Sequence, residues 1–349
     1  MPLIGTIFGA RALPPDDALM TTATPEQRGR IDLHHHFYPA VAGMDQAAFA
    51  DAVLKASGWV LPPENLPWSP EKAMAAMDRL GVEKAVLSAP TGGTVADQAN
   101  RKTVRFMNDL AHRVVEQHPD RFAFFAAVPV PLDPNAAIDE IAYAFDELGA
   151  VGLGIPASYG VGEHAHYLGS DALDPFWEEL DRRSAVVFVH GDQTPNSNRW
   201  PNRFLGLPVS EVPNETYKAA ADLVTTGKKN ALDRVRILLS HSGGSTPFLA
   251  ARVAGLSSYL GSSLTADEIV ESFQSFYFET ALSGFHTNLT ALESFVPDDR
   301  IMFGTDYPAV SVDTAEWYTG NVDRYFASRP DRGAAVARDN ALAIMPTLA

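Results

Sequence analysis

The sequence contains no cysteine among its 349 residues. Disulfide bonds, iron–sulfur clusters and thiolate-bound zinc are therefore excluded, and any metal ion has to be held by histidine and carboxylate side chains. Basic residues are also scarce, because 27 Lys and Arg stand against 43 Asp and Glu, which gives a net charge of −16. Such a charge repels nucleic acid and anionic membrane surfaces, so the expected partner is a small molecule.

Long apolar runs are missing as well. No stretch approaches the roughly 20 apolar residues that a membrane-spanning helix needs. The apolar residues 1–10 carry no basic residue ahead of them, which disfavours a secretory signal. We therefore expect a cytoplasmic protein in which residues 1–29 form an N-terminal arm and residues 30–349 form a single domain.

Short apolar runs alternate with amphipathic segments along the chain. The runs predict eight strands, at residues 30–35, 84–89, 122–128, 150–155, 185–189, 235–240, 275–280 and 300–304. Helix-like segments between them include residues 70–80, 104–117, 136–148, 174–183, 215–225 and 264–273. Apolar runs without alternation are typical of parallel strands buried on both faces, in either an open doubly wound sheet or a closed barrel.

Polar side chains capable of chemistry follow the first, fifth, sixth and eighth of these runs. Only a closed barrel gathers strand ends so far apart in sequence around one mouth, so we predict a (β/α)8 barrel of the TIM type. The longest connections, residues 38–69 and 191–214, follow the first and fifth strands. Both are expected to overhang the mouth as binding loops.

The first strand ends in three consecutive histidines, His34, His35 and His36. Side chains two residues apart point to the same side of an extended strand, so His34 and His36 can approach one ion while His35 faces away. His190 ends the fifth run and Asp306 follows the eighth. Together they offer a mixed nitrogen and oxygen ligand set, which suits an exchangeable catalytic metal with open positions.

His241, after the sixth run, is left without a place in this ligand set. An imidazole at the rim of a metal site can act as a general acid or base, or can hold a substrate anion. Any one of these histidines alone is more often a buried core residue. Their joint occurrence at the ends of four predicted strands indicates a functional site.

Four segments, residues 32–36, 188–190, 240–247 and 303–308, together resemble the amidohydrolase superfamily. More narrowly, they resemble its branch of aminocarboxymuconate-semialdehyde decarboxylase and aromatic-acid decarboxylases. Residues 68–82 fit the same branch, and the connection after the first strand is most similar to that of 6-methylsalicylate decarboxylases. The resemblance covers the chain from about residue 30 to its end.

The resemblance implies a single divalent ion, Zn2+ or alternatively Mn2+, held by four side chains: His34, His36, His190 and Asp306. It also implies that His241 and Asp306 are catalytic. Binuclear members of the superfamily carry a bridging carboxylated lysine on the fourth strand, and residues 151–155 contain no lysine. One metal is therefore expected.

The implied reaction is non-oxidative decarboxylation of an ortho-hydroxybenzoate such as a methylsalicylate, with release of CO2. No arginine lies between Arg30 and Arg79, where relatives often grip a second carboxylate, so an acid with one carboxylate is favoured. Three aromatic side chains of the mouth connections could sandwich a flat ring, or could only pack these connections: Phe37, Trp68 and Trp200. Arg252 matches a position that in relatives enters a neighbouring subunit's site, which implies a homodimer.

Two other functions stay open at this point. The same ligand set could hydrolyse a lactone, ester or amide, with a metal-bound water as nucleophile and Asp306 as base. Alternatively, the barrel could have lost catalysis and only bind a ligand or a partner subunit. The complete set of three histidines and one aspartate argues against this last reading.

Overall fold

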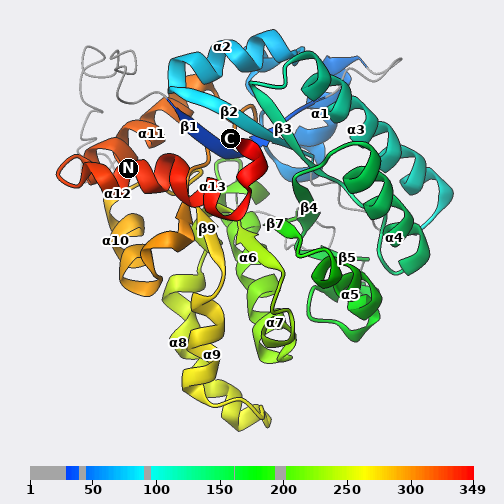
Figure 1. Cartoon of the computed structure of the whole chain (residues 1–349), viewed down its shortest axis with the longest axis vertical. Coiled ribbons are helices and arrows are strands. Elements are labelled where there is room, and N and C mark those ends of the chain that lie inside the picture. The colour runs from blue at the N-terminus through cyan, green and yellow to red at the C-terminus, as the bar shows by residue number, and fades with distance from the viewer. Residues whose placement is uncertain (1–28, 39–44, 90–95, 161, 193–201) are drawn as a thin grey trace, which may run out of the picture.

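The computed structural model describes residues 29–38, 45–89, 96–160, 162–192 and 202–349. Trp200 and all but the last residue of the predicted N-terminal arm lie outside the described residues. Within the described part, eight parallel strands curve into a nearly closed barrel with helices around it (Figure 1). The strand order is β1-β2-β3-β4-β7-β8-β9-β10, and neighbouring strands pair in parallel. The predicted (β/α)8 barrel is confirmed.

The barrel strands are short and apolar. They are β1 (Arg30–His36), β2 (Val82–Ser88), β3 (Phe122–Ala126), β4 (Gly152–Pro156), β7 (Val186–His190), β8 (Arg236–Leu239), β9 (Tyr277–Glu279) and β10 (Ile301–Met302). A small antiparallel pair, β5 (Ser158–Tyr159) and β6 (His166–Tyr167), follows β4. Each of the eight barrel strands overlaps a predicted run, because strands covered on both sides have to be apolar throughout.

Helices connect the strands and cover the outside of the barrel. They are α1 (Gln46–Ser57), α2 (Pro70–Leu80), α3 (Gln98–Gln117), α4 (Pro134–Ala142), α5 (Asp174–Arg182), α6 (Leu207–Thr225), α7 (Lys228–Ala231), α8 (Thr246–Ser257), α9 (Ala266–Gln274), α10 (His286–Phe295), α11 (Val312–Phe326), α12 (Pro330–Ala334) and α13 (Asn340–Ile344). The boundaries of α2 agree with the prediction. In contrast, α6 begins eight residues before the predicted residue 215, so part of the expected loop after β7 is helical.

The ring closes between β1 and β10. The backbone N–H of Asp306 donates to the carbonyl oxygen of His34 at 2.8 Å. The buried Asp32 carboxylate reinforces this seam, since it accepts hydrogen bonds from the Thr305 backbone N–H at 3.0 Å and from the Thr305 hydroxyl at 2.6 Å. These bonds hold the start of the loop after β10 against the end of β1.

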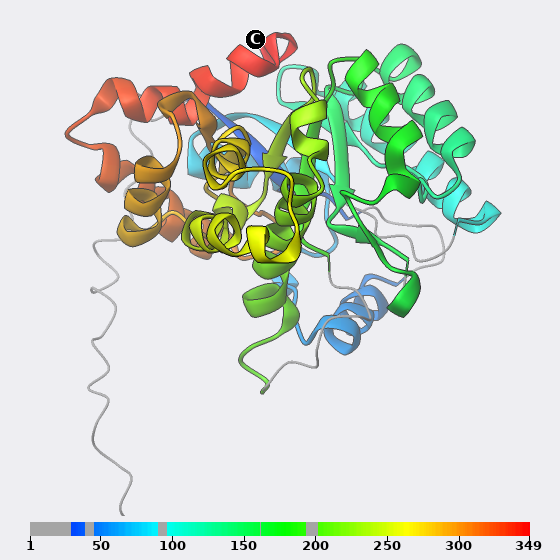
Figure 2. The same ribbon diagram turned by 90° about the horizontal axis from the view of Figure 1, so that it is seen from below.

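The connections after β1 and β7 meet at the mouth, as expected. Gly206, just before α6, packs so closely on the end of α1 that a Cβ there would lie 2.7 Å from the Gly58 carbonyl oxygen. The Trp59 indole N–H donates to the Ala309 carbonyl at 2.9 Å, which ties the same region to the loop after β10. Figure 2 shows α1, in blue, at the end of the barrel opposite to the C-terminal helix.

The barrel interior is apolar up to its mouth. Ile31, Leu33 and Phe188 belong to one buried cluster that also contains residues of the C-terminal segment, among them Ile344 and Leu348. The C-terminal segment therefore closes the other end of the barrel. No helix of the described residues is long and apolar enough to cross a bilayer.

Candidate metal centre and active site

Four predicted ligands come together at the carboxyl ends of three barrel strands. His34 and His36 lie on β1, His190 ends β7 and Asp306 follows β10, and one ligand atom from each lies within 4.8 Å of the others. Oδ1 of Asp306 is 3.2 Å from Nε2 of His34 and 3.1 Å from Nε2 of His36. The structure thus has the juxtaposition that the sequence predicted.

The register of β1 is what turns His34 inward. Regular alternation would place His34 on the opposite side from Ile31 and Leu33, which line the barrel interior. The pairing of β1 with β2 shifts register between Asp32 and His35, however. The His34 ring packs on the interior Phe188 with a centroid separation of 4.9 Å. An irregularity of this kind redirects a side chain near a site, and simple alternation does not reveal it.

The rings of the three histidines are oriented by hydrogen bonds at Nδ1. The acceptors are the Glu279 carboxylate for His34 (2.8 Å), the Ser88 carbonyl for His36 (3.2 Å) and the Gly191 carbonyl for His190 (2.7 Å). Because Nδ1 carries the donated proton, Nε2 is the nitrogen of each ring that can bind a metal ion, which for His34 requires the loss of a second proton. Metal-binding histidines are held in this way by the partners of their second nitrogen.

The charges of the cluster favour a cation. Burial lowers the pKa of His34, but the carboxylates of Glu279 and Asp306 outweigh it and raise that pKa to about 10. Burial likewise opposes ionisation of Asp306, yet the neighbouring His34 and His36 hold the pKa of its carboxyl well below the usual range. Two buried carboxylates beside three imidazoles therefore fit a positive ion, and the donor types suit a borderline metal such as Zn2+ or Mn2+.

Glu279, the last residue of β9, was not among the predicted site residues. It is fully buried, and its Oε1 accepts hydrogen bonds from the His34 ring at 2.8 Å and from the His241 backbone N–H at 2.5 Å. Oε2 accepts from the Ala281 backbone N–H at 2.5 Å. The sequence signal for Glu279 is an acidic residue inside an apolar strand. A carboxylate buried there needs several hydrogen-bond donors around it, which is typical of a site.

His241 lies in a strained loop directly after β8. Its φ is +53° and that of Ser242 is +56°, a region that residues other than glycine rarely adopt and that is common at functional sites. Its Nδ1–H donates to the Ala281 carbonyl at 3.1 Å, and its ring centroid is 4.8 Å from that of His34. Burial and then the adjacent His34 lower the pKa of His241. The imidazole is therefore neutral at pH 7, with an unprotonated Nε2 beside the cluster.

The predicted substrate-binding residues differ in where they lie. Phe37 and Trp68 are buried side by side at 5.9 Å between ring centroids, and Phe37 directly follows the ligand His36. Arg252 lies exposed on α8, outside the barrel, and the cluster does not include it. Trp200 lies outside the described residues.

Comparison with known proteins places this site in a family. The amidohydrolase family profile matches residues 31–346. The chain is 36% identical to the 6-methylsalicylic acid decarboxylase acuB of Aspergillus aculeatus over 332 residues, covering 91% of this chain and 96% of that protein. It is 34% identical to the 6-methylsalicylic acid decarboxylase of Penicillium expansum over 301 residues, covering 85% and 90% of the two chains.

Solved structures share the fold. A dihydroxybenzoic acid decarboxylase from Polaromonas sp. JS666, crystallised with manganese and the inhibitor 2-nitroresorcinol, superposes with a TM-score of 0.75 at 24% identity. The match covers 91% of this chain and 97% of that one. The family profile spans nearly all of the barrel, and the curated relatives match over almost their full lengths. The chain belongs to the amidohydrolase family.

Proposed function

We propose that the protein is a carboxy-lyase that removes the carboxylate of an ortho-hydroxybenzoate, 6-methylsalicylic acid or a close analogue, and releases CO2 without an oxidant. The observation that carries this proposal is the 36% identity to a 6-methylsalicylic acid decarboxylase across 91% of the chain. The cluster of three imidazoles and one carboxylate at the barrel mouth supports it.

We further propose that His34, His36, His190 and Asp306 hold one divalent ion, Zn2+ or Mn2+. A single ion is favoured because β4, which carries the bridging lysine of binuclear relatives, contains no lysine. When bound, such an ion would act as a Lewis acid on the carboxylate and the ortho oxygen of the substrate. By orienting the aromatic ring of the substrate, the ion would also place the carbon that is protonated within reach of an acid.

The reaction exchanges a carbon–carbon bond for a carbon–hydrogen bond. One proton has to reach the ring carbon that bears the carboxylate, and the electrons of the broken bond restore aromaticity as CO2 leaves. Asp306 is proposed to deliver this proton, because its Oδ1 faces the centre of the cluster. Its low pKa keeps the carboxyl ionised before the reaction, so it first has to take up the proton from solvent. His241, whose Nδ1 is held by Ala281, presents an unprotonated Nε2 that can accept a hydrogen bond from the substrate hydroxyl.

Two aromatic side chains near the site suit a flat ring. Phe37 and Trp68 are proposed to contact one side of the substrate, with Trp200 contributing from the connection after β7. We also propose that the enzyme is a cytoplasmic homodimer in which the exposed Arg252 reaches the partner. Size-exclusion chromatography with light scattering tests the dimer, and Arg252→Ala should then reduce turnover without changing metal content.

The activity is tested by incubating the metal-loaded protein with 6-methylsalicylic acid in D2O. The expected products are CO2 and 3-methylphenol with one deuterium at the carbon that lost the carboxylate. A strong chelator should abolish the reaction, and Zn2+ or Mn2+ should restore it. Opening of a lactone substrate without CO2 release from any hydroxybenzoate would instead establish the hydrolase alternative.

A further inference from the structure

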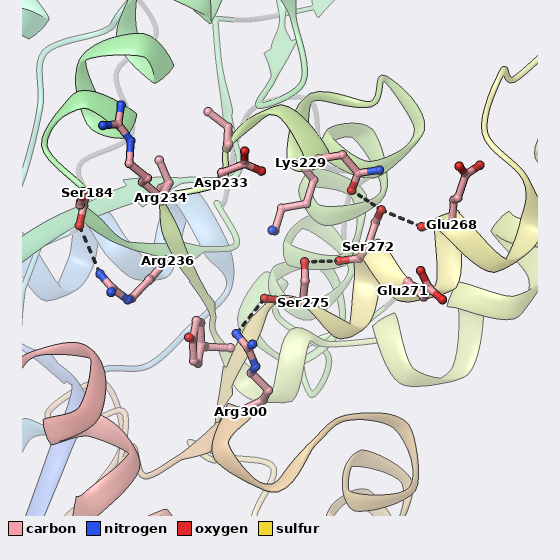
Figure 3. Close-up of a pocket in the computed structure, with 14 residues that line it drawn as sticks. Ser184, Lys229, Asp233, Arg234, Arg236, Glu268, Glu271, Ser272, Ser275 and Arg300 are labelled. Carbon is pink, nitrogen blue, oxygen red and sulfur yellow. Dashed lines mark hydrogen bonds between the residues drawn. The ribbon is translucent and has the colours of Figure 1, made fainter.

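A cavity of about 650 Å3 lies at the amino ends of β8, β9 and β10 (Figure 3). Arg236 and Tyr277 are the first residues of β8 and β9, and Arg300 directly precedes β10. The candidate metal centre lies at the carboxyl ends of barrel strands. The cavity is therefore separate from that centre, and none of its lining residues takes part in the proposed reaction.

Lys229, on the short helix α7, is a buried cation in this cavity. Its side chain is only 8% exposed, and no carboxylate within the described part of the chain forms an ion pair with its ammonium group. The face of the Phe276 ring lies 5.3 Å from Nζ, and the Asp233 carboxylate attracts the ammonium group without forming an ion pair with it. Burial and then the neighbouring Arg300 lower the pKa of Lys229 to about 8, so the group is still largely charged at pH 7. A buried charge without a counter-ion is costly, and an anion would offset that cost.

Two arginines, Arg300 and Arg236, line the same cavity. Figure 3 shows Arg300 and Lys229 pointing toward each other. The Arg300 guanidinium lies over the Tyr277 ring at 4.4 Å, and its Nη1 donates to the Ser275 carbonyl at 3.3 Å. Its Nε forms a 3.5 Å ion pair with the Asp299 carboxylate and makes no hydrogen bond to any described residue. Arg236 makes one long contact, from Nη1 to the Ser184 carbonyl at 3.5 Å.

Asp299 pairs with Arg300, but no carboxylate of the described residues forms an ion pair with Lys229 or Arg236. Glu268 is engaged at the start of α9, where its carboxylate accepts from the Thr265 backbone N–H at 2.7 Å. Asp233 and Glu271 are exposed at the rim. The fourth cation, Arg234, is already paired with Asp181 at 2.8 Å. Lys229 and Arg236 are therefore the two cations of the cavity that form no ion pair with a described carboxylate.

We propose that this cavity binds a phosphate group, either free phosphate or the phosphate of a small metabolite, between Lys229, Arg300 and Arg236. A lysine supplies a compact charge and arginines supply forked donors, which together suit the tetrahedral oxygens of phosphate. Binding to the native state alone stabilises it, so the ligand lowers the unfolding equilibrium constant by the factor 1 + [L]/Kd.

The test uses thermal and urea unfolding of the metal-loaded protein in inorganic phosphate, compared with chloride at equal ionic strength. At a phosphate concentration of 100 Kd, the unfolding constant should fall about 100-fold. Lys229→Met and Arg236→Gln should each lose most of this response. Lys102→Met removes an exposed lysine on α3 and the same amount of charge, so it should respond as the wild type does.

Phosphate that acted only at the metal centre would stabilise Lys229→Met as much as the wild type, and this result would overturn the proposal. Equal effects of phosphate and chloride on the wild type would overturn it as well. A parallel titration with glycerol 3-phosphate separates the two sources of the ligand. A stronger response than to inorganic phosphate identifies a phosphorylated metabolite, and an equal or weaker one identifies free phosphate.

Discussion

Nδ1 of His34 and Oε1 of Glu279 lie 2.8 Å apart, and neither side chain is exposed to solvent. The same carboxylate oxygen accepts the backbone N–H of His241 at 2.5 Å. One buried side chain therefore orients a ring of the proposed metal site and also holds the loop that carries the proposed catalytic imidazole. Glu279 acts through these neighbours, so it is a positioning residue.

Replacing Glu279 with Gln tests this role, because the amide keeps the shape and removes the charge. The affinity for Zn2+ or Mn2+ should fall about 10- to 100-fold, as is typical when the partner of a metal-binding histidine is changed. The Kd is measured by competition with a chromophoric chelator. Glu147→Gln, at an exposed position, is the matched control and should bind metal normally. Unchanged affinity in Glu279→Gln would show that the contact is only structural.

His190 and His241 should separate metal binding from catalysis. His241→Ala is expected to keep its metal content while kcat falls about 100- to 10,000-fold, the usual contribution of a general acid or base. His190→Ala should lose both metal and activity. Elemental analysis of the purified variants, alongside CO2 release, distinguishes these outcomes. A His241→Ala protein that bound no metal would make His241 a ligand.

Gly304 is predicted to tolerate no side chain. A Cβ there would lie 2.1 Å from Oε2 of Glu279 and 2.8 Å from Cβ of His34, both of them buried. Gly304→Ala should therefore cost about 1–3 kcal/mol of unfolding free energy and displace the His34 ring. Urea unfolding and metal content are the measurements. Gly320→Ala on α11 meets only the flexible end of Arg324 at 3.4 Å and should gain up to about 1 kcal/mol.

Lys229 should give stability a distinctive dependence on pH. Its pKa is about 8 in the folded protein and ordinarily 10.5, so between these values the unfolded chain binds more protons and the free energy of unfolding rises with pH. Below pH 8 the buried charge of Lys229 lowers the free energy of unfolding by about 3 kcal/mol. This destabilisation decreases above pH 8 and disappears by about pH 10.5.

In phosphate-free buffer, Lys229→Met should therefore be more stable than the wild type at pH 7. This advantage should shrink steadily as the pH rises from 8 to 10.5. Chemical unfolding at each pH provides the comparison, and the difference between the two proteins cancels the titration of other groups. A constant difference over this range would mean that the lysine keeps its ordinary pKa in the folded state.

The barrel could be predicted from sequence because its physical requirements are local. A strand covered on both faces is apolar throughout, so even the two-residue β10 stands out within a longer apolar run. The start of α6 was missed because residues 207–214, which include Pro208 and Pro213, were predicted to belong to a loop. Pro208 falls in the first helical turn, where the missing N–H costs nothing, and the helix also accommodates Pro213.

The proposed ligands could be predicted because His34, His36, His190 and Asp306 all end apolar runs, and a barrel has only one mouth for such ends. Glu279 could not, since its role depends on three donors that approach from β1, the loop after β8 and its own loop. The inward orientation of His34 depends on the register shift between β1 and β2, which cannot be recognised from the residue types. Contacts of this kind are set by packing between distant segments.

The hydrogen bonds between Asp32 and Thr305 join positions that are 273 residues apart in the sequence. During synthesis, the amino-terminal histidines therefore emerge from the ribosome long before the aspartate that completes their set. A nascent chain can present only part of the proposed ligand set until Asp306 has been translated, and ring closure over such a span is a slow step. Binding of the proposed metal ion by all four side chains is thus expected only after the barrel has closed.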